Sequence, residues 1–570
     1  MKESLRVGRA ERSEAATHAD FPSCAERSIF LGKALAMKNI GLDFGTTNSA
    51  ISYFDPKQKN LDCYRMRNAD SSYIPSFIGF EKEDNTIEIG KSARLNQGDD
   101  DYYVYSKFKM LLDETNKARL EQLGYIDKTP YTCAKNYIQE LLNNYKKEKN
   151  NAIEIEKLVI TVPEIWIKEH RHLSRECLKK ICKELNLPLK KLISEPVAAS
   201  VYFVYSYNQQ YESWFNGHVL VCDYGGGTLD LSLAKVEGQK ITVLECTGKG
   251  QDEHLIGKAG VAFDHEVVTK VYERVKNENL SRNNPNYLKI IQEFEEKKIF
   301  QKQGIDKKLT KYLKNSVIDK KIFKLLDDME CKPSDLVNAF NNVIKPDLLN
   351  ALDEMKKYLI KHDVQLDNSD KFRIVMAGGF SSFFLVQQTI REFFGSETSA
   401  DKRFDSCFDI EQTSLAIAKG AALIANDMFN IDLICPISVG LRVKALDSKG
   451  FIQEKDMPVL EKGKPLSLYK HPVFLKGGMT VNIDPSMRET PVILFLDDHD
   501  HRRYIKLDKG LDQFFANINT TANKWKVGFS VNEDYLFTLH TEDINEHKRE
   551  THLGDLLQKV SGLIYNEEIK

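Results

Sequence analysis

The stretches IGLDFGTTNSAIS at residues 40–52 and LVCDYGGGTLDLS at residues 220–232 are versions of one pattern. Each is an apolar run that ends in an aspartate, an aromatic residue and a glycine, and small hydroxyl or glycine residues then lead into a second apolar run. Glycine permits a tight turn and a close approach of the backbone, and successive N–H groups on such a turn bind phosphate oxygens. The pattern predicts two phosphate-binding strand–turn–strand hairpins, with Asp43 and Asp223 at equivalent positions.

The size and charge of the chain limit the classes of protein to which it can belong. A chain of 570 residues exceeds the size at which one core stops growing, so roughly two to four domains are expected. Its 42% of hydrophobic and 29% of charged residues are typical of a soluble globular protein. A net charge of -2 lacks the basic excess that nucleic-acid and membrane surfaces usually need, so we expect neither partner.

The cysteines and the hydropathy indicate the compartment. Ten cysteines are scattered along the chain without a CxxC pair. This is typical of reduced, mostly buried thiols in a cytoplasmic protein and argues against a zinc site. No window contains the ~20 apolar residues that are needed to span a bilayer.

Residues 1–36 differ from the rest, because they are rich in Arg, Glu, Ala and Ser and contain no apolar stretch long enough for a signal peptide. Met37 stands just before the first predicted strand. We expect residues 1–36 to be a disordered extension and Met37 to be the physiological start. A targeting segment is the alternative, but acidic residues such as Glu3, Glu11 and Glu14 are unusual in transit peptides.

Strands and helices alternate over residues 39–428. The expected strands cover 39–80 in a strand–turn–strand pattern, 158–162 and 372–377, and the expected helices cover 131–149, 167–185, 197–205 and 413–428. In the first of these helices Cys133, Tyr137, Leu141 and Tyr145 recur at a spacing of four, which places them on one apolar face. The alternation indicates α/β layers.

Residues 265–365 have a helical pattern and many charges. Their lysines include Lys297, Lys298, Lys302, Lys307 and Lys308. A solvated helical face explains this group of lysines better than an acidic ligand does.

Beyond Asn430 the sequence changes to short alternating strands that are separated by turn signals. The strands are expected at 437–444, 473–475, 480–483, 492–496, 527–531 and 536–540. They predict an all-β sandwich of roughly six to eight strands.

The two predicted turns could bind one ligand together if they face each other. An aspartate at the end of each strand can hold water around Mg²⁺, because that ion keeps several of its waters. Two facing hairpins would then hold a triphosphate from both sides. One such stretch alone is more often an ordinary turn, whereas two matched copies are a specific signal.

Five stretches resemble, in order, the five signatures of the seventy-kilodalton heat-shock chaperones of the DnaK type, within the actin and hexokinase ATPase superfamily: IGLDFGTTNSA, VITVPEIW, ISEPVAAS, VCDYGGGTLDLS and VMAGGFSS. The resemblance covers residues 37–427 closely, and it covers the β-rich part more loosely through CPISVGLR at 435–442 and residues 527–545. It implies an α/β fold, with a duplicated ribonuclease-H-like (actin-like) ATPase domain followed by an all-β sandwich domain.

The resemblance also implies domain boundaries. We expect a nucleotide-binding domain over 37–427 with a helical subdomain at about 265–365, a linker over 428–433, a peptide-binding sandwich over 434–555 and a short tail over 556–570. The 15 residues after Asp555 suffice for a helix of about 22 Å. The family's long helical lid is therefore expected to be missing.

Roles follow for the residues that match the family's motifs. Asp43 and Asp223 are similar to the carboxylates that hold Mg²⁺ through water. Lys109, with Lys107 as a second possibility, resembles the lysine that steadies the γ-phosphate, and Glu195 matches the glutamate that orders the attacking water. The expected catalytic set is Lys109, Glu195, Asp223 and Thr228, and the expected contacts with ATP or ADP are Asp43, Gly45, Thr46, Thr47, Asn48, Gly225, Gly226, Gly227, Glu295, Lys298, Gly378, Gly379 and Phe380.

Two further residues are expected to couple the domains. Pro163 and Arg171 fall where the family has its interdomain proline and arginine. Taken singly, several of the assigned residues have ordinary explanations: Arg171 as a solvated helix residue, Lys109 as a surface lysine, Glu195 as the end of a strand, and Gly378 with Gly379 as a turn. Their common order along the chain favours the functional interpretation.

The chain departs from the family at two places that matter. After Gly379 the family usually continues with Ser-Thr-Arg, whose arginine packs on adenine, whereas this chain has Phe380, Ser381 and Ser382. The acidic, leucine-rich linker is replaced by FNIDL at residues 429–433. The first change predicts that adenine is held differently or more weakly, and the second puts the usual linker docking and the stimulation by J-domain partners in question.

The resulting expectation is a slow, Mg²⁺-dependent ATPase of the chaperone type, which hydrolyses ATP to control the binding of extended peptide or unfolded protein. Its expected partners are such peptides, a J-domain co-chaperone and a nucleotide-exchange factor, and it is expected to be a monomer. Two alternatives stay open: a non-catalytic ATP-binding scaffold, and a small-molecule kinase of the same superfamily.

Overall fold

The computed structural model describes residues 36–55, 60–67, 69, 71–148, 153–164, 166, 172–250, 259–280, 286–395, 402–404, 410–446, 449–482, 493–497, 502–506, 524–543, 546–554 and 556. Three expectations fall outside these residues: the N-terminal extension except Ala36, the C-terminal tail except Leu556, and Arg171. Within the described part of the chain, no helix combines the length and the apolar character needed to cross a membrane.

The first sheet is built around the hairpin at residues 40–52. It contains β1 (Ala36–Asp43), β2 (Asn48–Asp55), β3 (Asn60–Cys63), β4 (Ile74–Pro75), β8 (Ile153–Val162) and β9 (Leu189–Ser194). The order is β3-β2-β1-β8-β9, with β4 beside β2. β1 and β2 are antiparallel, and β8 joins β1 in parallel. Leu42 and Ile160 are fully buried, as the apolar runs of the predicted hairpin and strand require.

The second sheet is built around the hairpin at residues 220–232. It contains β10 (Asn216–Tyr224), β11 (Leu229–Glu237), β12 (Lys240–Lys249), β15 (Phe372–Ala377) and β16 (Asn430–Asp432). The order is β15-β10-β11-β12-β16. β10 and β11 are antiparallel and β15 joins β10 in parallel, so β15 stands to β10 as β8 stands to β1. β15 has the bounds that the sequence predicted.

Two helices, α6 (Glu195–Tyr211) and α13 (Ile410–Ala425), pack against each other and against both sheets. Small residues permit this contact, because a Cβ on Gly420 would lie 1.8 Å from the carbonyl oxygen of Ala198. In the same way, a Cβ on Gly41 of β1 would lie 2.3 Å from the backbone nitrogen of Ala422. The alanine-rich helix predicted at 413–428 is thus present, and it begins and ends three residues earlier than predicted.

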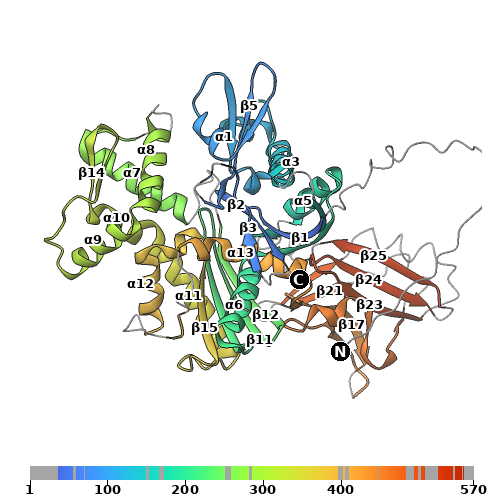
Figure 1. The fold of residues 1–570 in the computed structure, drawn as a ribbon. Coiled ribbons are helices and arrows are strands. Elements are labelled where there is room, and N and C mark those ends of the chain that lie inside the picture. Colours follow the sequence, from blue (N-terminus) through green and yellow to red (C-terminus); the bar gives the residue numbers. More distant parts are fainter. Residues whose placement is uncertain are drawn as a thin grey trace, which may run out of the picture.

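Two further helices, α3 (Pro130–Glu148) and α5 (His172–Glu184), share a hydrophobic cluster with the first sheet. Cys133, Tyr137, Leu141 and Tyr145 of α3 are all fully buried in it, which confirms the apolar face predicted for this helix. A three-stranded sheet of order β6-β5-β7 lies nearby (Figure 1). It comprises β5 (Phe77–Glu81), β6 (Ile87–Ile89) and β7 (Tyr102–Ser106), accompanied by α1 (Lys91–Leu95), η1 (Phe108–Leu111) and α2 (Lys117–Gln122).

The predominantly helical segment begins at Gly260, earlier than the predicted residue 265, and it also contains a β-hairpin that the sequence did not predict. Its elements are α7 (Gly260–Lys276), α8 (Tyr287–Phe300), α9 (Lys302–Lys314), β13 (Phe323–Leu325), η2 (Leu326–Asp328), β14 (Met329–Cys331), α10 (Pro333–Ala339), η3 (Phe340–Ile344) and α11 (Lys345–Lys361). α11 packs on β11 and β12, so the end of this segment covers the second sheet. The short η4 (Gly379–Ser382) and α12 (Phe384–Phe393) follow β15.

The C-terminal part consists of two antiparallel sheets that share one hydrophobic cluster. One has the order β18-β17-β21-β22 and the other β19-β23-β24-β25, with β20 beside β23. The bounds are β17 (Ser438–Leu446), β18 (Ile452–Leu460), β19 (Val473–Phe474), β20 (Val481–Asn482), β21 (Ile493–Asp497), β22 (Arg502–Lys506), β23 (Lys524–Val531), β24 (Phe537–Asp543) and β25 (Lys548–Gly554), with η5 (Leu466–Tyr469) and η6 (Lys476–Gly478) between strands. β18, β22 and β25 were not among the predicted strands. We refer to β17–β25 as the C-terminal β unit.

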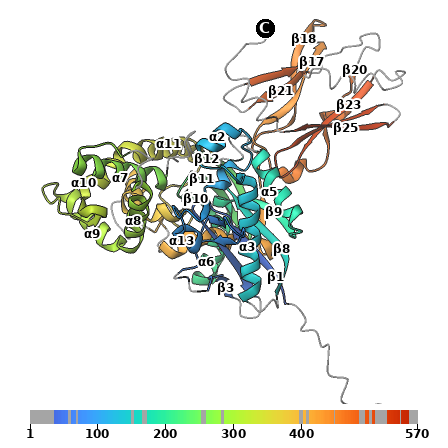
Figure 2. The same ribbon diagram turned by 90° about the horizontal axis from the view of Figure 1, so that it is seen from above.

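The C-terminal β unit lies on the side of the molecule away from α7–α10 (Figure 2). Its loop between β23 and β24 carries Asp534, which accepts a hydrogen bond of 2.9 Å from Arg175 of α5 and also pairs with Lys179. The next residue, Tyr535, is 8% exposed and has a left-handed backbone with φ 58°. Just before this unit, β16 adds to the second sheet as an edge strand, parallel to β12.

Candidate active site

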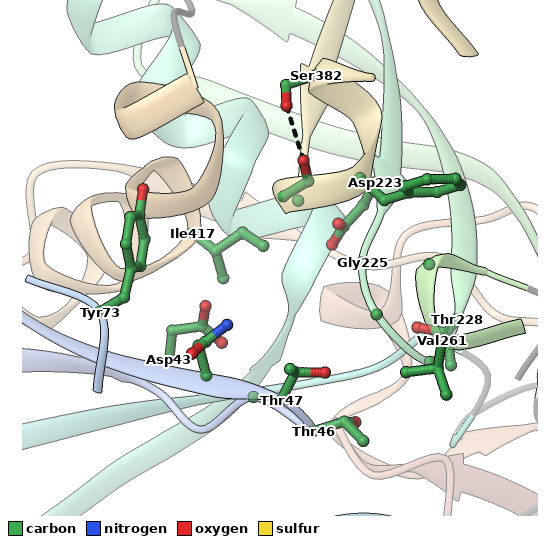
Figure 3. Close-up of a pocket in the computed structure, with 18 of the residues that line it drawn as sticks. Asp43, Thr46, Thr47, Tyr73, Asp223, Gly225, Thr228, Val261, Ser382 and Ile417 are labelled. Atoms are coloured by element: carbon green, nitrogen blue, oxygen red, sulfur yellow. Dashed lines mark hydrogen bonds between the residues drawn. The ribbon is translucent and has the colours of Figure 1, made fainter. Parts of the chain in front are cut away.

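One pocket brings both hairpin turns together. Figure 3 shows Asp43, Thr46 and Thr47 on one side of it and Asp223 and Thr228 on the other. Every residue that the sequence assigned to catalysis or nucleotide contact lines this pocket: Asp43, Gly45, Thr46, Thr47, Asn48, Lys109, Glu195, Asp223, Gly225, Gly226, Gly227, Thr228, Glu295, Lys298, Gly378, Gly379 and Phe380. Lys107, the second possibility for the phosphate lysine, is not among the lining residues.

The first turn is fastened by Ser76, which lies between β4 and β5. Its hydroxyl donates a hydrogen bond of 2.7 Å to the carbonyl oxygen of Gly45, and its N–H donates one of 2.8 Å to the carbonyl oxygen of Thr47. Glycine is required at position 45, because a Cβ there would lie 1.9 Å from the carbonyl oxygen of Asn48. The turn is therefore held tightly enough to present its backbone in one geometry.

The second turn is attached to the start of α7. The N–H of Val261 donates a hydrogen bond of 2.8 Å to the carbonyl oxygen of Gly226. The two turns come close to each other at this point, because a Cβ on Gly226 would lie 2.2 Å from the hydroxyl of Thr47. Both turns therefore face one shared space, as the repeated pattern in the sequence predicted.

Asp43 lies at the end of β1, at the base of the pocket. It is 9% exposed and accepts a hydrogen bond of 2.9 Å from the hydroxyl of Thr161 at its Oδ1. Burial, followed by the nearby carboxylate of Glu195, raises the pKa of Asp43 to about 7, although Lys109 acts in the opposite direction. The side chain therefore changes charge close to neutral pH.

Asp223 lies at the end of β10 and is 3% exposed. Burial raises its pKa well above the usual range, and the carboxylates of Glu195, Asp230 and Asp43 add to this effect. Its Oδ2 is buried and has no hydrogen-bond partner among the described residues. Gly378, at φ 76°, leaves room for the carboxylate, because a Cβ there would lie 2.4 Å from Oδ1 of Asp223.

Asp230 does not line the pocket, but it raises the pKa of Asp223, and the sequence reasoning missed it. It is fully buried in β11 and pairs with Asp223 across the β10–β11 ladder. The available signal was an aspartate inside the apolar run TLDLS, at a position where a buried carboxylate requires compensation.

Lys109 is not a surface lysine. It lies in η1, is 1% exposed, and forms an ion pair of 2.5 Å with Glu195, which opens α6 and is 8% exposed. Its ammonium also lies 5.8 Å from the centre of the Phe44 ring and 5.9 Å from that of Trp166. A lysine held this deeply is a fixed positive charge inside the pocket.

The opposite part of the pocket is lined from α8 and η4. Glu295 of α8 receives a hydrogen bond of 2.8 Å from Arg94 of α1, so this pair joins the lobe of β5–β7 to the lobe of α7–α10. Lys298 was expected both in a group of solvated lysines and at the nucleotide, and it does not belong to the solvated face. Its side chain is 15% exposed and pairs with the buried Asp264 of α7, because it lies on the side of α8 that faces α7.

The charges in the pocket fit a divalent cation. Three buried carboxylates, of Asp43, Asp223 and Glu195, surround one lysine, and the raised pKa values of the two aspartates show that their negative charges are poorly compensated. No group of three or more His, Cys, Asp or Glu in the described residues is arranged around one metal position. Two carboxylates suit Mg²⁺, which keeps several waters and needs few protein ligands.

Pro163, expected to couple the domains, follows directly after β8 and does not line the pocket. The next residue, Glu164, is 5% exposed, and its charge acts on Tyr535 of the C-terminal β unit. The end of β8 therefore lies close to that unit, whereas Arg171 lies outside the described residues.

Comparison with known proteins agrees with this geometry. The family model described as Hsp70 protein matches residues 39–455. The chain is 24% identical over 465 residues to the chaperone protein DnaK of Nitrosopumilus maritimus, which covers 77% of this chain and 63% of the relative. It is also 24% identical over 469 residues to those of Thermotoga petrophila and Thermotoga maritima, which covers 80% of this chain and 71% of each relative. A match over most of its length shows that the chain belongs to the Hsp70 family.

Proposed function

We propose that this chain binds ATP with Mg²⁺ in the pocket, hydrolyses it slowly, and thereby controls the binding of extended peptide by the C-terminal β unit. The observation that carries the proposal is the convergence of both hairpin turns with Lys109 and the buried carboxylates on one space. Membership of the Hsp70 family supports a chaperone-type function that uses ATP.

The proposed domains follow the sequence expectation. The two central sheets are proposed to be the duplicated halves of a ribonuclease-H-like, actin-like domain over 37–427, because each has an antiparallel hairpin flanked by a parallel strand. Residues 428–433 are proposed as the linker and 434–555 as the peptide-binding sandwich. The linker includes β16, which is a strand of the second sheet and so a direct connection between the two domains.

The residues of the pocket are proposed to have different roles in phosphoryl transfer. The turns would supply N–H groups and hydroxyls to the phosphates, and Asp43 and Asp223 are the residues that would hold Mg²⁺. When bound, Mg²⁺ neutralises negative charge on the phosphates. Lys109 supplies a positive charge at the γ-phosphate, and Glu195 accepts a hydrogen bond from the attacking water and so orients it. Because Lys109 and Glu195 pair directly in this structure, a γ-phosphate that attracts Lys109 also frees the Glu195 carboxylate to bind water.

Control of peptide binding requires that the nucleotide lobes and the C-terminal β unit respond to each other. The pairs of Asp534 with Arg175 and Lys179 join this unit to α5, and β16 joins it to the second sheet. Nucleotide changes peptide affinity only if it favours one arrangement of these contacts over another. At the start of the edge strand β18, Phe451 is 67% and Ile452 71% exposed, which offers apolar surface for an extended peptide.

Steady-state ATP hydrolysis tests the assignment of the pocket. Removal of a preorganised charge costs about 100-fold or more in turnover, so Lys109→Ala should lose nearly all activity, and Thr228→Ala should lose most of it. Lys107→Ala is the matched control, because Lys107 does not line the pocket, and it should retain activity. Absence of ATP binding by the wild-type chain, or equal loss in the two lysine variants, would contradict the proposal.

A non-catalytic ATP-binding scaffold is the second candidate. It is favoured by the replacement of the family's acidic, leucine-rich linker by FNIDL at residues 429–433, because control of peptide binding would depend on that linker. Single-turnover hydrolysis separates the two functions. An ATPase should hydrolyse bound ATP and lose this in Glu195→Gln, whereas a scaffold should bind ATP tightly without turnover, in both the wild type and the variant.

A further inference from the structure

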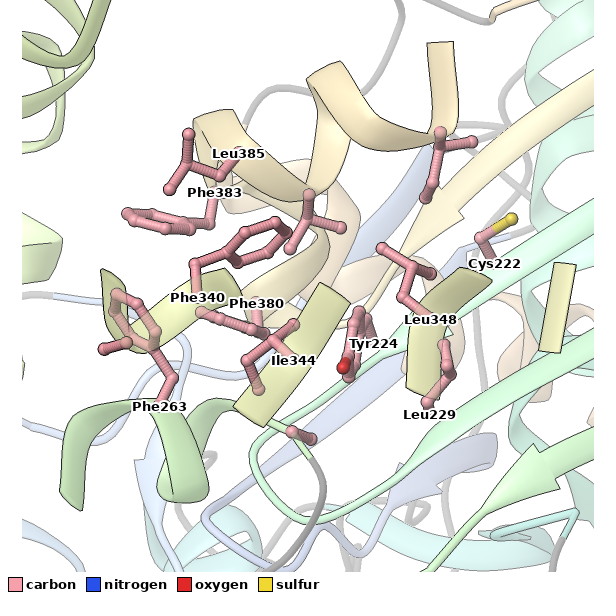
Figure 4. Close-up of a cluster of buried hydrophobic side chains, with 14 of the residues drawn as sticks. Cys222, Tyr224, Leu229, Phe263, Phe340, Ile344, Leu348, Phe380, Phe383 and Leu385 are labelled. Carbon is pink, nitrogen blue, oxygen red and sulfur yellow. The ribbon is translucent and has the colours of Figure 1, made fainter. Parts of the chain in front are cut away.

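Lys298 is held in a cage of aromatic rings. Its ammonium lies 5.4 Å from the centre of the Phe380 ring, 5.9 Å from that of Phe263 and 6.0 Å from that of Phe294. The rings belong to η4, α7 and α8, and Figure 4 shows Phe263 and Phe380 within the same buried cluster. Cations are attracted to the faces of aromatic rings, most strongly where water is excluded.

The cage is closed on one side by a buried carboxylate. Asp264 is 6% exposed, and both of its oxygens contact the Lys298 ammonium, with a distance of 2.7 Å to Oδ2. Burial raises the pKa of Asp264 to about 6, and Glu295 adds to this effect while Lys298 opposes it. Without Lys298, the ionised form of Asp264 would have no compensating charge among the groups that act on it.

Lys298 binds a residue of another helix and not the acidic residue one turn before it on its own helix. Glu295 stands three residues before Lys298, a spacing at which oppositely charged side chains usually pair along a helix. Here Glu295 binds Arg94 instead, and Lys298 binds Asp264. Lys298 is therefore fixed by tertiary contacts and still lines the pocket.

We propose that Asp264 and Phe380 are positioning residues that hold Lys298 as a fixed cation at the nucleoside end of the pocket. This rests on the proposed function, in which the two hairpin turns hold the phosphates and leave the part lined by α8 and η4 to the nucleoside. An ammonium has three N–H donors, so contact with Asp264 leaves at least one for the nucleotide. Phe380 stands where the family's Ser-Thr-Arg pattern begins, and its ring forms one side of the cage around the Lys298 ammonium.

The packing around residue 380 also explains how a phenylalanine is accommodated there. Phe380 is 6% exposed, and its ring lies 5.5 Å from that of Phe383 at an interplanar angle of 12°. It also packs at 5.3 Å from the rings of Tyr224 and Phe263. The ring is thus fixed from several sides and cannot turn away from Lys298 without disrupting this packing.

The test is a double-mutant cycle on ATP binding by the full chain, measured by titration calorimetry. Asp264→Asn and Lys298→Met should each weaken ATP binding by about tenfold, and the double variant should be no weaker than Lys298→Met, because Asp264 acts through Lys298. Lys297→Met is the matched control, because Lys297 pairs with Glu293 outside the pocket, and it should bind as the wild type does.

Inorganic triphosphate, which lacks a nucleoside, is the second probe. Its affinity should change by less than about threefold in Asp264→Asn, whereas a general loss of folding would weaken both ligands together. Unchanged ATP affinity in Asp264→Asn, or additive losses in the double variant, would overturn the inference. Absence of ATP binding by the wild-type chain would instead overturn the proposed function, so the two failures are distinguishable.

Discussion

At the scale of single residues, the pocket buries two carboxyl groups whose ionised forms are disfavoured. Asp43 and Asp223 are both nearly inaccessible, and burial together with the carboxylate of Glu195 raises the pKa of each. Charges that are costly in the empty protein favour the binding of a cation. The site therefore gains affinity for Mg²⁺ at the expense of stability in its absence.

The pH dependence of stability tests this at Asp43. Its pKa is about 7 in the folded chain and about 3.9 in an unfolded one, so the folded state binds more protons between these values. The free energy of unfolding contributed by this group therefore falls as pH rises from about 4 to about 7. In nucleotide-free protein, Asp43→Asn should be more stable than the wild type, by a margin that grows from about pH 4 to about pH 7 and then levels off.

Thermal melts of both proteins, recorded without Mg²⁺ and nucleotide, measure this margin. Addition of Mg²⁺–ATP at about pH 8 should reverse the order, because only the wild type keeps both carboxylates. A margin that does not change with pH would show that Asp43 ionises normally.

The sequence predicted the residues that line the pocket, but it did not predict the neighbouring residues that shift their pKa values or fix their side chains. Asp43 was recognised because it lies in a repeated motif, and Lys109 and Glu195 because they match residues of the family's pattern. Asp230 and Asp264 were not, because their roles depend on neighbours from other strands and helices. The resemblance placed Lys298 at the nucleotide, but the charge pattern of its helix placed it on a solvated face, because a lysine on a charged helix gives no sign of which side faces the core.

At the scale of elements, the contact between α6 and α13 depends on glycine and alanine. The backbone of Ala198 reaches so close to Gly420 that a methyl group has no room there. This contact connects α6, which begins at Glu195, to the helix that packs against β1 and β2. A substitution at Gly420 should therefore change the position of Glu195 in the pocket as well as the stability of the protein.

The close contact can be tested by replacing two helical glycines with alanine, one at the contact and one away from it. Gly420→Ala should destabilise the protein by roughly 1–3 kcal/mol or more, because the two helices must move apart. Gly304→Ala in α9, where nothing lies within 4 Å of the new methyl group, should stabilise it by up to about 1 kcal/mol. Chemical denaturation of the two variants gives both values, and the same sign for both would contradict the close approach.

The strands that were missed have a common physical cause. β18 begins with IQEKD, β22 is RRYIK and β25 is KRETHLG, and none of these shows the alternation of apolar and polar residues expected for a half-buried strand. β18, β22 and β25 are also the last strands in their sheets, where one edge is not paired within the sheet. The well-alternating strands, such as β23 and β24, were predicted within a few residues.

At the scale of the whole molecule, contacts across the pocket connect two lobes that are far apart in the sequence. Arg94 binds Glu295 at 2.8 Å, and Gln292 donates a hydrogen bond of 2.9 Å to Gln97. Glu295 also lines the pocket, so this bridge lies at the edge of the proposed nucleotide site. The bridge is therefore expected to slow nucleotide release.

Nucleotide release should report the loss of this bridge. A partly exposed ion pair is worth about 1 kcal/mol, so Arg94→Ala should release a fluorescent ADP analogue about fivefold faster in stopped flow. Arg119→Ala is the control, because Arg119 pairs with Glu114 of the same lobe. Equal release rates in all three proteins would exclude the bridge as a constraint.

Coupling between the nucleotide pocket and the C-terminal β unit is the central claim, and the contacts of Asp534 with α5 are its structural basis. The most direct test is the dissociation rate of a fluorescent unfolded peptide from the full chain, measured with ATP and with ADP. The account predicts different rates in the two nucleotides for the wild type and a much smaller difference for Asp534→Asn. Equal rates for the wild type in ATP and ADP, or no peptide binding in either, would contradict it.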